Sequence, residues 1–320
     1  MKRLLIAVLA ALLPLALPLA AQAQAWPTRA VKFVCPLGPG SGADITGRLL
    51  ADRLSKRWGQ PVVFDNRPGG EGVIAINAVI SARDDHTLLY GPSSSFVGHP
   101  YQLESIPYDP RELQPVARVS STVVVIAVPA SLGVNSLKEL MAMVRAQPGK
   151  MNWATITGVT DLVIAGYLKG AGLDAVKISY KNPVAGLTDL VEGRLHFYAA
   201  AYAIVRSQAQ AGRVKVLAIQ NRGRVPGLDF PTVAEEGFPG LNFDGLVGLI
   251  AARSSGLPDA VRERIAADVR AELSDPVIVE RMTQTGQIVA PGTPAELAAA
   301  IDEQAGHLAA LAKALGIKPK

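Results

Sequence analysis

The stretch Val31-Lys-Phe-Val-Cys-Pro-Leu-Gly-Pro-Gly-Ser-Gly-Ala-Asp44 decides the fold, because it joins a short apolar strand to a glycine-rich turn and then to a helix. A strand, a glycine loop and a helix start in this order direct unpaired backbone N–H groups at one point, where the helix dipole also favours negative charge. The sequence therefore predicts an anion-binding loop at the carboxyl end of the first strand.

Short β-branched runs alternate with amphipathic helices through most of the remaining sequence, a pattern typical of a parallel sheet flanked by helices. The expected strands are Val31–Cys35, Val62–Phe64, Thr87–Tyr90, Met151–Thr155, Ala175–Ser179, Leu195–Ala200, Val214–Gln220 and Gln287–Ala290. The expected helices cover residues 44–58, 71–82, 136–146, 160–169, 184–192, 203–211, 258–274, 275–285 and 294–315. An irregular, proline-rich region fills residues 91–115.

Two extended runs, Arg118–Val128 and Val247–Ala252, separate the two series of strands and helices. This order indicates a discontinuous domain, because the chain leaves the first series of strands and helices, forms the second series, and then crosses back to end in a helical tail. We expect lobe 1 to consist of residues 26–122 plus 248–320 and lobe 2 to consist of residues 123–247.

Residues 1–25 have the pattern of an export signal. Lys2 and Arg3 form a positive start, residues 4–19 are apolar, and two overlapping A-x-A sites end at Ala23 and Ala25. We therefore expect cleavage near Ala23 or Ala25 and delivery to a bacterial periplasm.

Composition excludes several classes of protein. Removing 25 of the 320 residues leaves 295, enough for two domains, and lowers the net charge from +5 to +3 because Lys2 and Arg3 are lost with no acid. The remaining basic residues are scattered, which argues against nucleic-acid binding. Cys35 is the only cysteine, so no intramolecular disulfide can form, and we interpret it as a buried strand residue.

No enzymatic motif stands out. The chain lacks H-E-x-x-H, G-x-S-x-G, a P-loop and paired cysteines, and its four histidines lie on separate predicted elements. The sequence Gly38-Pro-Gly-Ser-Gly42 lacks the spacing of a dinucleotide fingerprint. We therefore expect no catalytic residues, no metal and no organic cofactor.

Three loops, each after a predicted strand, offer polar groups to a ligand: residues 36–44, 91–95 and 155–161. The first carries glycines and Ser41, the second three consecutive serines, and the third several threonines. Ligands of open α/β sheets bind at the carboxyl ends of the strands, where these loops lie. Asp44 is most simply the N-cap of the first helix, and direct contact with a ligand is the alternative.

A set of longer motifs follows in a characteristic order. They are Trp26-Pro-Thr-Arg-Ala-Val-Lys-Phe-Val34, Gly59-Gln-Pro-Val-Val-Phe-Asp-Asn-Arg-Pro-Gly-Gly70, Pro107-Tyr-Asp-Pro110, Gln147-Pro-Gly-Lys150 and Phe230-Pro-Thr-Val-Ala-Glu-Glu-Gly237. Together they resemble the Bug family of extracytoplasmic solute receptors, the binding components of tripartite tricarboxylate transporters. The resemblance covers essentially all of residues 26–320.

The resemblance implies a two-lobed, flytrap-like α/β fold of the type II periplasmic binding proteins, with a mostly parallel sheet in each lobe and two crossover strands. It also implies a carboxylate held between the lobes by backbone amides, small hydroxyls and waters. The ligand-binding residues expected on this basis are Leu37, Gly38, Gly40, Ser41, Asp44, Ser93, Ser94, Ser95, Thr155, Thr157, Thr160 and Tyr180.

The sequence departs from the family pattern at several positions expected near the ligand. Leu37 stands where the family usually has phenylalanine, Val159 replaces a common glycine, and Leu246 a frequent aromatic residue. Ala200 lies where many members carry aspartate or asparagine, which weakens the case for an amino-acid ligand. We therefore expect a rather apolar cleft, suited to an aliphatic or aromatic carboxylate.

The function predicted from these features is that of a periplasmic receptor that captures a small organic carboxylate and delivers it to the membrane subunits of a tripartite transporter. The alternative is a ligand-sensing partner of a signalling system such as a sensor kinase, which would use the same fold and site. An exported hydrolase has no nucleophile–base pair to support it. We expect a monomer.

Overall fold

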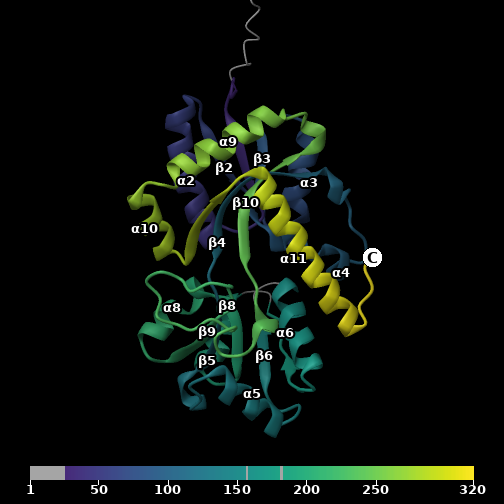
Figure 1. Cartoon of the computed structure of the whole chain (residues 1–320), viewed down its shortest axis with the longest axis vertical. Coiled ribbons are helices and arrows are strands. Elements are labelled where there is room, and N and C mark those ends of the chain that lie inside the picture. The colour runs from purple at the N-terminus through teal and green to yellow at the C-terminus, as the bar shows by residue number, and fades with distance from the viewer. Residues whose placement is uncertain (1–25, 156–157, 181–182) are drawn as a thin grey trace, which may run out of the picture.

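The structure, a computed structural model, describes residues 26–155, 158–180 and 183–320. Two lobes are stacked along the long axis of the molecule, and each is built on one sheet with helices packed around it (Figure 1). The predicted two-lobed α/β fold is therefore confirmed.

The upper lobe contains a six-stranded sheet in the order β11-β4-β10-β3-β1-β2. Its strands are β1 (Val31–Cys35), β2 (Val62–Asn66), β3 (Thr87–Pro92), β4 (Leu113–Thr122), β10 (Gly245–Ala252) and β11 (Gln287–Gly292). The helices of this part of the chain are α2 (Gly42–Trp58), α3 (Val73–Ala82), α4 (His99–Gln102), α9 (Asp259–Glu272), α10 (Pro276–Gln284) and α11 (Pro294–Leu315). The short helix α4 lies in the region that the sequence predicts to be irregular.

The lower lobe contains a five-stranded sheet in the order β7-β6-β8-β5-β9. Its strands are β5 (Val124–Pro129), β6 (Asn152–Thr155), β7 (Val176–Lys177), β8 (Phe197–Ala201) and β9 (Val214–Ile219), and its helices are α5 (Leu137–Ala146), α6 (Gly158–Gly170), α7 (Pro183–Val191) and α8 (Tyr202–Gln210). Among the helices of the described ranges, none is long and apolar enough to cross a membrane.

Both sheets are mixed rather than mostly parallel, which corrects the expectation from the sequence. Strands β1, β2 and β3 run parallel, whereas β10 is antiparallel to both β3 and β4, and β5 is antiparallel to both β8 and β9. The physical reason is the chain path. Strands β10 and β5 each enter their lobe from the other lobe, so they must run away from the boundary between the lobes. Their neighbours β3, β4, β8 and β9 run toward that boundary, and the pairing is therefore antiparallel.

The chain first crosses between the lobes at the junction of β4 and β5, and it returns between β9 and β10. The predicted crossing Val247–Ala252 is part of β10, which lies in the upper sheet from its first residue. Buried Asn221 joins the two crossings, since its Oδ1 accepts from the N–H of Val124 at 3.0 Å and its Nδ2 donates to the carbonyl of Thr122 at 3.0 Å. The lobe boundaries at 122/123 and 247/248 stay a proposal.

Helix α11 links the lobes a third time. It starts on the upper sheet and runs down beside α6 of the lower lobe (Figure 1). Leu308 and Leu311 pack with Val163 of α6, and Lys169 donates to the carbonyl of Leu315 at 3.0 Å. Relative motion of the lobes must therefore involve this helix.

Helix α2 packs so closely on β2 and β3 that position 47 requires glycine. A Cβ on Gly47 would lie 2.2 Å from the ring of Phe64 and 2.7 Å from the ring of Tyr90. The Oγ1 of Thr46 and the phenol oxygen of Tyr90 are 3.2 Å apart, within hydrogen-bond distance. This close packing fixes the first turn of α2 at the edge of the cleft.

Cys35 ends β1 and is fully buried, as the sequence predicts for a structural residue. Burial raises the pKa of its thiol to about 11. A thiol with a raised pKa is a poor nucleophile at neutral pH, because the thiolate is the reactive form.

Candidate functional site

A cavity of about 410 Å³ lies between the lobes. Its upper wall consists of the loop before α2, residues 69–72 and the serine turn, and its lower wall of residues from α6, α8 and Phe243. The predicted binding residues that line it are Leu37, Gly40, Ser41, Ser94, Ser95 and Thr160. The structure places Gly38, Asp44, Ser93, Thr155 and Tyr180 outside this lining, and Thr157 falls outside the described residues.

Ser41, rather than Asp44, is the N-cap of α2, so the prediction that Asp44 caps the helix is wrong. The Oγ of Ser41 accepts from the N–H of Asp44 at 3.1 Å, which places Asp44 in the first turn. The Asp44 carboxylate reaches back past the cap instead and accepts from the N–H of Gly40 at 2.9 Å. Its opposite oxygen accepts from Asn66 at 2.9 Å and from Arg48 at 3.0 Å. The carboxylate therefore holds the loop in shape.

These contacts determine the protonation of Asp44. Burial alone would raise the pKa of its carboxyl group, but the hydrogen bonds from Gly40, Asn66 and Arg48 outweigh burial and hold the pKa below its ordinary value. Asp44 is therefore ionised at neutral pH, and its charge is satisfied by the loop and by Arg48.

We expect Asp44→Asn to destabilise the protein at pH 7 by about 1.5–3 kcal/mol, the range for hydrogen bonds to a charged group. Because the folded-state pKa is lowered, the stabilisation is present above the unfolded value of about 3.9 and is lost as the pH falls through the folded value. The difference in thermal midpoint between wild type and variant should therefore shrink from pH 7 to pH 3. Asp52→Asn, at an exposed position of the same helix, is the matched control. A constant difference across this pH range would contradict the role of Asp44.

The first turn of α2 presents hydrogen-bond donors to the cavity. Gly42 and Ala43 line it, and no described carbonyl accepts from their N–H groups, as is usual for the first positions of a helix. The Ser41 hydroxyl accepts from Asp44, which leaves its own hydrogen for a further acceptor. These donors and the helix dipole favour an anion at this point.

The serine turn forms the adjoining part of the upper wall. Ser94 and Ser95 line the cavity, whereas the Ser93 hydroxyl points away and donates to the side-chain oxygen of Gln304 on α11. Gly72 brings the neighbouring chain against this turn, since a Cβ at that position would lie 2.9 Å from the carbonyl oxygen of Ser95. Two of the three predicted serines thus face the cleft.

Two predicted residues of the lower lobe have partners of their own outside the cavity. Thr155 donates to Asp161, which also pairs with Lys177, and Tyr180 donates to Asp189 at 2.6 Å. Their contact with a ligand stays a prediction. Thr160 is the predicted residue of this lobe that does line the cavity, and its side chain is buried.

The lower wall is largely apolar. Ala201, Ala203, Ile204, Val124 and Phe243 line it, and Ala200 lies in the buried core of β8. Among the described residues that line the cavity there is no Lys, Arg or His, and Glu71 is the one charged residue. A site with neutral donors on one side and an apolar wall on the other suits a carboxylate with a hydrocarbon body.

Sequence reasoning missed the part of the site next to the crossings. Thr122 at the end of β4 and Gln287 at the start of β11 line the cavity and are joined by a 2.9 Å hydrogen bond from the Gln287 amide to the Thr122 hydroxyl. These residues are 165 positions apart, and only the pairing of β11 with β4 brings them together. No local motif could have identified them.

Within the described ranges, one group of side chains is close enough to hold a metal ion: Asp84, Asp85 and His86. Each of these side chains already has protein partners: Asp84 accepts from Thr87, and Asp85 pairs with His86. The group also lies at the start of β3, at the opposite end of that strand from the cavity. It therefore takes no part in the candidate site.

Comparison with known proteins adds a family. The model of a protein family described as "Tripartite tricarboxylate transporter family receptor" matches residues 46–317. The chain is also 33% identical over 313 residues to a UPF0065 protein of Bordetella bronchiseptica, an alignment that covers 96% of this chain and 92% of that protein.

Three solved structures are similar over nearly the whole chain. Rpa4515 of R. palustris with adipate is 27% identical with a TM-score of 0.80, covering 92% of this chain and 100% of that one. The periplasmic binding protein BugD is 26% identical with a TM-score of 0.76, covering 92% and 100%. MatC from Rhodopseudomonas palustris with bound malate is 25% identical with a TM-score of 0.74, covering 89% and 99%.

Proposed function

Because the chain belongs to the receptor family of tripartite tricarboxylate transporters, we propose that it captures a small organic carboxylate between its lobes and delivers it to such a transporter. The family consists of periplasmic solute-binding receptors rather than enzymes, in agreement with the prediction from the sequence. Export through residues 1–25, with cleavage near Ala23 or Ala25, belongs to the same proposal.

The observation that carries the proposal is the position of the α2 N-terminus. Its free N–H groups and the hydroxyls of Ser41, Ser94 and Ser95 converge on the upper wall of the cavity, and the lower wall opposite them is apolar. A carboxylate placed at the helix end would receive several hydrogen bonds, and its hydrocarbon part would contact the alanines and Phe243. Capture would close the lobes about the two crossings.

Two similar receptors support a ligand with this chemistry, since one was solved with adipate and the other with malate. The apolar lower wall of this chain favours a longer aliphatic or an aromatic acid over a short hydroxy acid. Delivery to a membrane transporter is inferred from the family alone.

We expect thermal unfolding of the exported protein to identify the ligand class. A panel of adipate, malate, citrate, benzoate, a fatty acid and glutamate would be tested after denaturation and refolding, which removes any ligand carried through purification. A ligand at 100 times its Kd stabilises by about 2.7 kcal/mol, which should raise the midpoint of a protein of this size by at least about 2 °C. A shift with acids but not with their amides would support the proposal, whereas a cooperative transition that no acid moves would contradict it.

A further inference from the structure

Arg118 occupies an unusual place for a charged residue. It lies in β4, an inner strand of the upper sheet, between the fully buried Ala117 and Val119. Arginine is rarely found in such positions unless its charge is paired, because removing a charge from water is costly. A partner for the Arg118 guanidinium is therefore expected.

The described residues provide no such partner. The Arg118 side chain makes no hydrogen bond or ion pair with any of them, and its Nε is buried without an acceptor. The carboxylate of Glu296 lies nearby, but its Oε2 accepts from the N–H of Thr293 at 2.7 Å. The hydrogen bonds from Thr293 are the main reason that the pKa of Glu296 is lowered, and the charges of Arg270 and Arg118 contribute less. Arg118 is thus a partly buried residue whose Nε has no acceptor among the described residues.

The sheet is built irregularly on both sides of this residue. Arg118 pairs with Gly248 of β10 and with Gly292 of β11, and the register shifts next to it in both pairings. A Cβ on Gly292 would lie 3.1 Å from the Cβ of Arg118, so the glycine makes room for the arginine. Such irregularities redirect side chains and are frequent beside functional sites.

Arg118 lines a second cavity, of about 640 Å³, which we call the hinge cavity. It lies between α11 and the chain that returns to the upper lobe, and its polar lining includes Arg222, Asn242, Gln304 and His307. Arg222 is held in place by Glu303 at 2.6 Å and by Asp244 at 3.6 Å. Phe243 lines both this cavity and the ligand cleft, and its buried ring is part of the wall between them.

We propose that the hinge cavity is a second binding site, for a small oxyanion that pairs with Arg118. The guanidinium can donate two parallel hydrogen bonds to a carboxylate or a phosphate. The amide of Asn242 offers a further donor to the same space. Gln304 already donates to the carbonyl of Asp244 at 2.8 Å, and the carboxylates of Asp244 and Glu303, which also line the cavity, pair with Arg222. The anion would lie beside both crossings and α11, but outside the cleft proposed for the transported solute.

The test uses inorganic phosphate as the probe, added to the exported protein at ionic strength held constant with chloride. Phosphate should raise the thermal midpoint saturably in wild type, and Arg118→Gln should weaken the apparent affinity at least about tenfold, since charge-assisted bonds are the strong ones. Arg213→Gln, at an exposed arginine, is the matched control. If Arg118→Gln fails to fold, Arg222→Gln replaces it, since this variant should also weaken phosphate binding.

A cleft variant separates this site from the transported solute. Ser94→Phe is designed to block the cleft, so phosphate should still raise the thermal midpoint of this variant. Succinate added to the same variant shows whether organic acids also bind at Arg118. An effect of phosphate or succinate that disappears with Arg118→Gln supports the site, and the anion that gives the effect shows whether the site accepts phosphate or a carboxylate. No effect of phosphate on wild type, an equal effect of phosphate on Arg118→Gln, or a phosphate effect that Ser94→Phe abolishes would overturn the proposal. None of these results depends on whether the cleft captures a carboxylate.

Discussion

Replacing Ser94 by phenylalanine is expected to abolish capture of whichever carboxylate stabilises the wild-type protein. Ser94 lines the upper wall of the cleft next to the α2 N-terminus, so a benzyl group at this position would occupy the space proposed for the ligand. It would also remove one of the hydroxyl donors. We expect an affinity at least about 100-fold weaker, which corresponds to about 2.7 kcal/mol of binding free energy, measured by calorimetric titration.

The same substitution at Ser207 is the control. Ser207 lies exposed on α8 of the lower lobe and does not line the cavity, so Ser207→Phe should bind normally. Both variants should retain cooperative unfolding because neither position is in the core. Wild-type affinity in Ser94→Phe would mean that the carboxylate binds elsewhere in the molecule.

Much of the fold could be predicted because local signals agree with it. Helix α11 has the predicted bounds, Pro294–Leu315, since Thr293 and Glu296 form a capping box at its start and Gly316 ends it in a left-handed conformation. Strand β1 is likewise predicted to the residue. In these places the residues that start and stop the element are adjacent to it in sequence.

The direction of the strands could not be predicted in the same way. An alternation of strands and helices favours parallel pairing, but β10 pairs with β3 and β4, far from it in the chain, and its direction is set by the return from the lower lobe. Such long-range pairings leave no periodic signal in the sequence.

The first loop shows why individual roles are harder to predict than the site itself. Ser41 and Asp44 are both good N-cap residues, and the choice depends on whether the N–H of Gly40 is available to the Asp44 carboxylate. The loop lines the cavity between the lobes, but the prediction that Asp44 caps the helix is wrong. For Tyr180, which the family resemblance places near the ligand, no sequence pattern reveals the hydrogen bond to Asp189.

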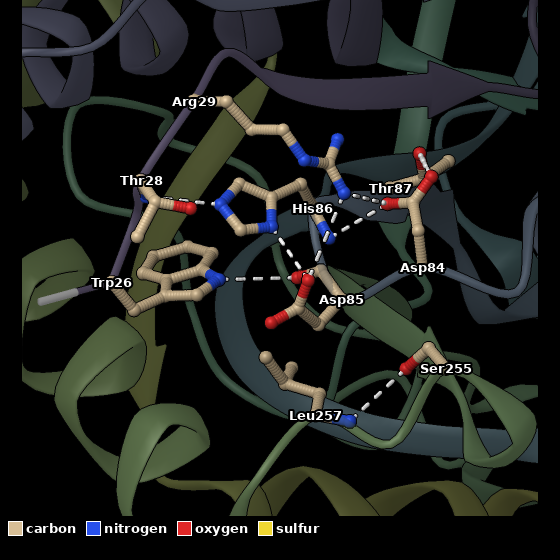
Figure 2. A network of polar contacts seen from close by, with 9 residues as sticks. All are labelled: Trp26, Thr28, Arg29, Asp84, Asp85, His86, Thr87, Ser255 and Leu257. Carbon is tan, nitrogen blue, oxygen red and sulfur yellow. Dashed lines mark hydrogen bonds and ion pairs between the residues drawn. The ribbon is translucent and has the colours of Figure 1, made fainter. Parts of the chain in front are cut away.

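Trp26→Ala should lower the thermal midpoint by about 6–10 °C, because truncating a buried tryptophan costs roughly 3–5 kcal/mol and the midpoint of a large domain shifts by about 2 °C per kcal/mol. Trp26 is 5% exposed and packs edge-on against Trp58, with ring centroids 5.0 Å apart. Figure 2 shows its indole N–H donating to the carbonyl of Asp85, at 3.2 Å. The same segment is held again where the N–H of Thr28 donates to Nε2 of His86 at 3.1 Å.

Trp26→Phe separates the packing of Trp26 from its hydrogen bond. Phenylalanine keeps an aromatic ring against Trp58 but loses the hydrogen bond to Asp85. The decrease in thermal midpoint should therefore be smaller than for Trp26→Ala, and the lost hydrogen bond should account for about 1 kcal/mol of the loss in stability. Carboxylate affinity should be unchanged in both variants, because Trp26 precedes β1, whereas the cleft lies beyond the other end of that strand. A midpoint for Trp26→Ala within about 1 °C of wild type, well below the shift expected for a core truncation, would show that the segment before β1 is not part of the cooperative core.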